Sequence, residues 1–168
     1  MARAPRVAVV VVLCVLIATG ASAEPEYTGA LNPGESFTWE GAAVGLNPLY
    51  FEAEAGCSTD PTNFCEYALL SYTNPVPADD ADGRLTRTST ITITPTAVSD
   101  LDLQVYASDA AGTMGTMIGS STAYPIDNEG VESVYAVMRT TTEVPTVYVL
   151  VEVIHYANVG GYTGSATF

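Results

Sequence analysis

Apolar and polar residues alternate in short runs along most of this chain, and this alternation constrains the fold more than any other feature. Successive side chains of a β-strand point to opposite faces, so a period of two is typical of a half-buried strand. Nine such runs, rich in Thr, Val, Tyr and Ile and separated by turn residues, cover residues 36–40, 48–55, 65–72, 84–94, 101–107, 116–121, 131–138, 146–156 and 161–168. No window has the helical period. The sequence therefore predicts an all-β sandwich.

Two of these runs predict more than a strand. The run TVYVLVEVIHY over 146–156 is apolar on both faces, which favours a place in the middle of a sheet. In SDLDLQVYASDAAG, Leu101, Leu103 and Val105 alternate with Asp100 and Asp102. An EF-hand loop needs Gly where Val105 stands, and no feature supplies the cleft of a glycosidase. We expect these aspartates to lie on the polar face of a strand, with Asp100 stabilising the turn before it.

The amino-terminal segment predicts export. Residues 1–23 contain a short basic start, the apolar run VAVVVVLCVLIA and the sequence Ala21-Ser22-Ala23, which is typical of a cleaved signal peptide. This run is shorter than the roughly twenty apolar residues that span a bilayer. We therefore expect a secreted, extracellular protein with no membrane insertion, whose residues 24–168 form a single domain.

The charge balance limits the partners. The chain has 19 Asp and Glu against five Arg and Lys, a formal net charge of −14. Loss of Arg3 and Arg6 with the signal peptide makes the mature charge −16. Such a surface repels phosphate backbones and anionic lipids, so nucleic acid is excluded as a partner. An acidic surface also favours solubility, cations or a basic partner.

Two cysteines remain after the signal peptide. Cys57 and Cys65 enclose a stretch of Ser, Asp, Pro and Asn with loop composition, and an even pair in an oxidising compartment predicts a disulfide. Zinc is the alternative, but two cysteines and the distant His155 are a poor ligand set.

No motif predicts an enzyme. The sequence lacks a G-x-S-x-G nucleophile elbow, an H-E-x-x-H pair and a Gly-rich phosphate loop. His155, the only histidine, ends an apolar strand, where a structural role is favoured over that of a general base. Two alternatives stay open: a carboxylate-dependent hydrolase, and a carbohydrate-binding module suggested by ten tyrosines and Trp39.

Several elements in order give the chain a family resemblance. The opening Gly29–Ser36, the strand DLDLQVY from Asp100 to Tyr106, the strand from Tyr148 to Val153 and the closing Gly161-Tyr162 resemble the bacterial pre-peptidase C-terminal domain family. The stretch from Cys65 to Leu70 is similar to an element of secreted members. The residues that we expect to carry this structural motif are Asp100, Asp102, Tyr106, Tyr148 and Tyr162.

The resemblance implies a jelly-roll-like, antiparallel β-sandwich of about eight or nine strands that is not itself catalytic. Because no peptidase precedes it in this sequence, we expect a free-standing module that binds an extracellular protein, matrix or polysaccharide, or has a structural role. Some members of the family take up calcium, the only cofactor that the sequence suggests. The loop ADDADG, with Asp79, Asp80 and Asp82, is the candidate segment, since Ca²⁺ prefers oxygen ligands.

Overall fold

The computed structural model describes residues 25–42, 45–46, 57, 65–97, 99–122, 130–158 and 160–168. The predicted signal peptide and the predicted strand 48–55 lie outside these residues. Among the described residues, no helix has the length and apolar character that crossing a membrane requires. The strands are β1 (Tyr27–Leu31), β2 (Ser36–Gly41), β3 (Gly45–Leu46), β4 (Cys65–Thr73), β5 (Arg84–Pro95), β6 (Asp100–Ser108), β7 (Met117–Ser121), β8 (Glu132–Thr141), β9 (Thr146–Asn158) and β10 (Tyr162–Thr167).

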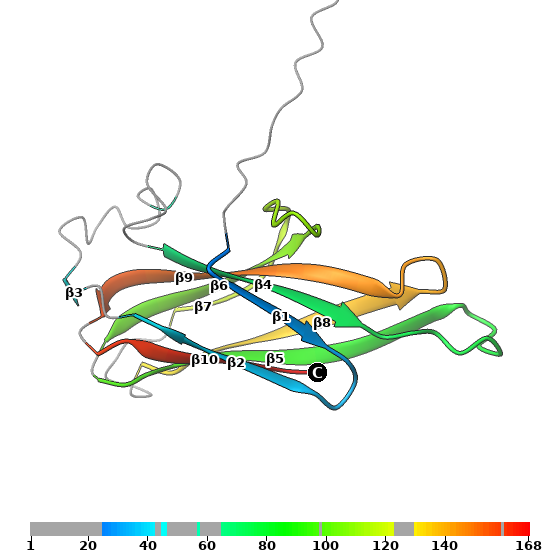
Figure 1. Cartoon of the computed structure of the whole chain (residues 1–168), viewed down its shortest axis with the longest axis horizontal. Coiled ribbons are helices and arrows are strands. Elements are labelled where there is room, and N and C mark those ends of the chain that lie inside the picture. Colours follow the sequence, from blue (N-terminus) through cyan, green and yellow to red (C-terminus); the bar gives the residue numbers. More distant parts are fainter. Residues whose placement is uncertain are drawn as a thin grey trace, which may run out of the picture.

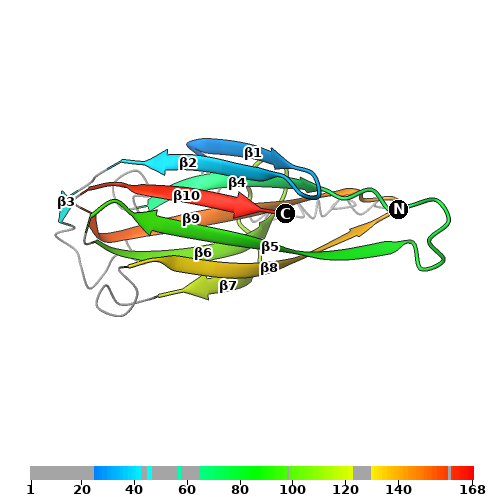
Figure 2. The ribbon, with the colours of Figure 1, turned by 90° about the horizontal axis from the view of Figure 1, so that it is seen from below.

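The strands form two sheets that pack face to face (Figures 1 and 2). One sheet has the order β2-β10-β5-β8, and the other has the order β1-β4-β9-β6-β7, with β3 paired to β9. Without β1 and β3, eight strands remain, and most connections between consecutive strands cross from one sheet to the other. This order is that of a jelly roll, in which each sheet interleaves early and late strands. The prediction of an all-β, jelly-roll-like sandwich is confirmed.

The sheets are antiparallel with one exception. Strand β1 runs parallel to β4, with Tyr27 opposite Ala68 and Leu31 opposite Tyr72. A parallel neighbour requires a connection that leaves the sheet. Here the chain crosses to β2 through the turn at Gly34, whose φ of 87° suits glycine. The sequence pattern did not predict β1 or β3.

Eight of the nine predicted strands are present, and β9 lies in the middle of its sheet as expected, between β4 and β6. Its odd-numbered valines from Val147 to Val153 face the other sheet. The alternation in β6 is also confirmed, because Leu101, Leu103 and Val105 are buried. Side chains of these strands form the main core with residues of the four-stranded sheet such as Ile91 and Ile93.

Three aromatic side chains pack together at one part of this core. Trp39 of β2 is 4% exposed and packs against Phe37 and Tyr27. Its indole lies over Gly164, the residue opposite it on β10, where a Cβ atom would collide with the ring. Glycine is therefore required at this position by close packing rather than by backbone conformation.

A second hydrophobic cluster lies on the outer face of the six-stranded sheet. Leu150 and Ile154, on the even-numbered face of β9, are buried there with Cys57, Cys65 and Tyr67. This explains why β9 is apolar on both faces. The outer face of this sheet is thus covered in part.

Candidate functional site

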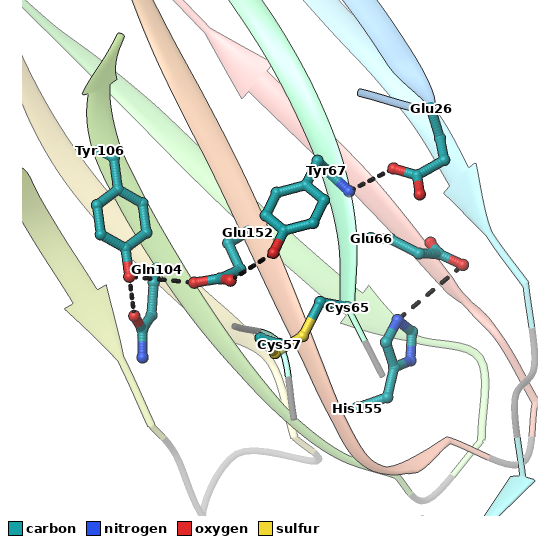
Figure 3. The surroundings of a disulfide bond; sticks show 9 residues. All are labelled: Glu26, Cys57, Cys65, Glu66, Tyr67, Gln104, Tyr106, Glu152 and His155. Carbon is teal, nitrogen blue, oxygen red and sulfur yellow. Dashed lines mark hydrogen bonds and ion pairs between the residues drawn. A yellow bond between two sulfur atoms is a disulfide. The ribbon is translucent and has the colours of Figure 1, made fainter. Parts of the chain in front are cut away.

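The disulfide between Cys57 and Cys65 lies in this outer cluster and confirms the pairing that the sequence predicted. The two Cα atoms are 5.6 Å apart, a normal distance for a bridged pair. Both cysteines are buried, with 7% and 3% of their surface exposed. The bridge joins Cys57 to Cys65 at the start of β4 (Figure 3).

A row of polar side chains crosses three strands beside the disulfide (Figure 3). Gln104 of β6, Glu152 of β9 and Tyr67 of β4 are opposite one another in the register of the sheet. The Tyr67 hydroxyl donates to Glu152 Oε1 at 2.9 Å, and the Tyr106 hydroxyl donates to Glu152 Oε2 at 3.1 Å. Tyr106 also contacts the amide oxygen of Gln104. A hydroxyl has one proton, so Tyr106 cannot donate to both Glu152 and Gln104. With the Gln104 amide turned by 180°, its N–H donates to the Tyr106 oxygen, and all three side chains are paired.

This carboxylate is held inside the protein. Glu152 is 4% exposed and Tyr67 is 3% exposed. Burial and the negative charge of Glu152 raise the pKa of Tyr67 far above its usual value, so the phenol stays a donor at every physiological pH. A buried carboxylate needs such donors, because an unpaired one is costly. The row therefore fixes β4, β9 and β6 to one another.

Sequence reasoning missed this row. Its signal was present: Glu152 interrupts the apolar run of β9, and a carboxylate in such a run requires partners.

The sulfur atoms of Cys57 and Cys65 and an oxygen of Glu152 lie within 4.8 Å of one another, the one such group of metal-ligand side chains in the described part of the chain. The cysteines are bonded to each other, so they are not thiolate ligands.

A second polar group joins the two sheets at one end of the sandwich. Tyr162 of β10 donates from its hydroxyl to Glu66 Oε2 of β4 at 2.7 Å, and the Ala42 amide donates to Glu66 Oε1 at 3.3 Å. His155 Nε2 lies 4.0 Å from Glu66 Oε1 (Figure 3). Tyr162, which the sequence predicted as part of a structural motif, is thus a link between sheets.

Burial decides the protonation of His155 and Glu66. Burial lowers the pKa of His155 to about 4, since the imidazole is fully enclosed, and raises the pKa of Glu66. The distance of 4.0 Å to Glu66 is too long for a hydrogen bond, so the nearby carboxylate does not restore the charge. His155 is therefore a neutral packing residue against the Tyr162 ring, with centroids 5.8 Å apart.

The structure does not bring the other predicted residues into one site. Asp100 and Asp102 lie half-buried on the outward side of β6, and Tyr148 lies half-buried on β9. In the candidate calcium loop, Asp80 accepts a hydrogen bond from the amide of Asp82 at 2.9 Å, which is a turn contact. Calcium binding by Asp79, Asp80 and Asp82 stays a prediction.

The outer face of the four-stranded sheet is the main candidate surface, and we call it the hydroxyl face. Its outward side chains are Ser36, Thr38 and Glu40 of β2, Thr163, Ser165 and Thr167 of β10, the even-numbered residues of β5 from Arg84 to Thr94 and the odd-numbered residues of β8 from Ser133 to Thr141. Twelve of these seventeen are Ser or Thr.

The hydroxyl face is exposed and carries little charge. Tyr135 is 72% exposed and Val137 is 53% exposed, and no described residue packs over either of them. The charged side chains of the face are Glu40, Arg84 and Arg139, in a chain whose net charge is −14. Among the described acidic residues, Glu40 is the only one whose side chain belongs to this face. The sequence showed the alternating threonines of β5, but not that three other strands continue the same surface.

Taken together, fold and surfaces define a jelly-roll β-sandwich in which one outer face is partly covered and the other is exposed among the described residues. No protein-family model matches the sequence, and no curated protein does. Among solved structures, a pre-peptidase C-terminal domain of a collagenase from Bacillus anthracis is similar at 9% identity and a TM-score of 0.40, over 87% of this chain and 98% of that one. It is a domain of the family that the sequence motifs resemble.

A second similar structure is PliG of Aeromonas hydrophila, a periplasmic inhibitor of g-type lysozyme. Its identity is 12% and its TM-score 0.33, over 84% of this chain and 96% of that one. At these values neither structure assigns a ligand, partner or activity to this chain.

Proposed function

We propose that this protein is a secreted, non-catalytic β-sandwich module that binds an extracellular matrix component through the hydroxyl face. The observation that carries the proposal is the difference between the two outer faces. The six-stranded sheet is covered around the disulfide, with Leu150 and Ile154 buried, and the large apolar side chains that it exposes among the described residues are Met117 and Ile118 of its edge strand β7. The four-stranded sheet exposes Tyr135 and Val137, which are more exposed than either. Exposed apolar groups on an otherwise polar sheet mark a surface that a partner can cover.

The buried polar groups support a non-catalytic role. Each oxygen of Glu152 accepts a hydrogen bond from a tyrosine. Glu66 accepts one from Tyr162 at Oε2 and one from the Ala42 amide at Oε1. These carboxylates join strands and sheets, and a general acid or base has to reach a substrate. The disulfide fits an oxidising compartment, which supports secretion.

The test is sedimentation of the purified secreted protein with insoluble collagen and with insoluble polysaccharides. The face variant Thr90→Glu/Thr92→Glu places two carboxylates at the centre of the hydroxyl face. The control variant Thr28→Glu/Ser120→Glu places two on exposed positions of the other sheet. We expect at least one support to retain the wild type and the control but not the face variant. Equal retention of both variants, or of no protein at all, would refute the proposed face.

A further inference from the structure

We infer that the partner of the hydroxyl face is a neutral polysaccharide, an inference that rests on the proposed function and names its ligand class. The face offers an ordered array of neutral hydroxyl groups, with one exposed aromatic ring on the edge strand β8. Such a surface is suited to a polymer whose own surface consists of hydroxyl groups and flat sugar rings.

The composition of the face argues against a protein partner. Protein interfaces are enriched in aromatic residues, Met and Arg, and depleted in Ser. Here Ser and Thr are twelve of the seventeen outward side chains, and Tyr135 is the only aromatic one. A Ser or Thr hydroxyl supplies one donor and two acceptors, so it can pair with sugar hydroxyls in either direction.

Most of these hydroxyls are unused within the described chain. Thr92 and Ser133 bond to each other at 2.9 Å, and Thr141 accepts from the Val144 amide at 3.0 Å. The other nine have no hydrogen-bond partner among the described residues: Ser36, Thr38, Thr86, Thr88, Thr90, Thr94, Thr163, Ser165 and Thr167. Ligand hydroxyls can therefore bind without displacing contacts inside the protein.

The register places these groups in straight rows. Thr38, Ser165, Thr92 and Ser133 are opposite one another across the four strands, as are Ser36, Thr167, Thr90 and Tyr135. None of the three strand pairs has a register shift, whereas β6 has one with each of its neighbours. Strand geometry spaces the groups about 4.7–4.9 Å across the strands and roughly 6.6–6.8 Å along them. A repeating polymer can meet such a repeating array at many points.

Charge selects a neutral polymer. The face carries one carboxylate, Glu40, and two guanidinium groups, Arg84 and Arg139, so its net charge is close to zero. The rest of the chain is strongly acidic and repels polyanions such as acidic polysaccharides. Tyr135, 72% exposed at the end of one row, offers a ring face on which a sugar can pack.

The experiment measures retention of the purified protein on cellulose, chitin and insoluble neutral glucan, with calcium polygalacturonate gel and insoluble collagen as comparison supports. The variant Thr88→Val/Thr90→Val removes two hydroxyls that have no partner among the described residues and keeps side-chain shape, and Tyr135→Ala removes the ring. The control Thr28→Val/Ser120→Ala removes two exposed hydroxyls from the other sheet. Thermal melts verify that each variant is folded.

We expect at least one neutral polysaccharide to retain the wild type and the control, with affinity about tenfold lower or weaker still for the valine variant, because two hydrogen bonds are lost. Tyr135→Ala should weaken binding as well. Retention on collagen alone, lost in the valine variant, would overturn this inference and leave the proposed binding face intact. Polysaccharide binding that the valine variant keeps would overturn the inference, and retention on no support would overturn both proposals.

Discussion

Replacing Tyr67 with Phe tests the buried polar row most directly. The change removes one oxygen atom and leaves the ring, which is packed against Leu150 and Ile154 in the outer cluster. It also removes the donor to Glu152 Oε1, which is 2.9 Å from the hydroxyl. Glu152 is 4% exposed, so water cannot replace this donor easily. The Tyr106 hydroxyl donates to the other oxygen, Glu152 Oε2, at 3.1 Å and is not affected by this change.

The expected loss follows from the burial of both partners. A hydrogen bond to a charged group contributes about 1.5–3 kcal/mol to the free energy of unfolding. A domain of this size loses roughly 2–4 °C in melting temperature for each kcal/mol. We therefore expect Tyr67→Phe to lower the melting temperature by about 3–12 °C.

Thermal denaturation followed by circular dichroism measures this shift, with Tyr148→Phe as the matched control. Tyr148 lies on the central strand β9, is only half-buried, and its hydroxyl has no hydrogen-bond partner among the described residues. A double-mutant cycle with Glu152→Gln isolates the pairwise contribution. If Tyr67→Phe costs no more than Tyr148→Phe, the row does not stabilise the fold and the argument is wrong.

Four further predictions follow from the other features. Gly164→Ala should lower the free energy of unfolding by about 1–3 kcal/mol in chemical denaturation, since the added methyl meets the Trp39 ring; an unchanged midpoint would contradict the close contact. The single histidine signal in an NMR titration should show a pKa near 4 for His155. Because this pKa lies below the unfolded value, protonation of His155 should lower the free energy of unfolding as the pH drops from about 6.5 towards 4. An NMR midpoint near the unfolded value would show that the ring is not buried. Cys57→Ser should cost roughly 2–3 kcal/mol by the loop-entropy estimate, with loss of the crosslink in non-reducing mass spectrometry. Calcium binding by the loop around Asp80 predicts a calcium-specific rise in melting temperature that Asp80→Asn abolishes; an equal rise with magnesium or none would remove the site.

Much of the fold could be predicted because its signal is local. Alternation in β6 identified Leu101, Leu103 and Val105 as inward residues, and the doubly apolar run identified β9 as a central strand. Strand β1 was missed for a physical reason. Tyr27–Leu31 is short, and its stability comes from pairing with β4, which is distant in the sequence.

The polar groups were predicted only in part. Cys57 and Cys65 were paired correctly because export, an even number and loop composition all favoured one bridge. The partners of Glu66 and Glu152 were not found, since they come from other strands through register. Tyr67 and Glu152 are 85 positions apart in sequence, and Tyr162 and Glu66 are 96 apart.

The sequence by itself determined the class of fold, the side chains that share a face of each strand, and the excess of negative charge. A period of two fixes the fold class and the shared faces strand by strand, and the charge follows from the composition alone. Only the tertiary structure decided which face of each sheet is covered. Packing of the two sheets buried one face of β9, and the outer cluster around the disulfide buried part of the other. Strand pairing within the four-stranded sheet aligned the hydroxyls of β2, β10, β5 and β8 on one surface. The physical reason is that strand register and sheet packing are set by contacts between distant segments, and these contacts have no local pattern in the chain.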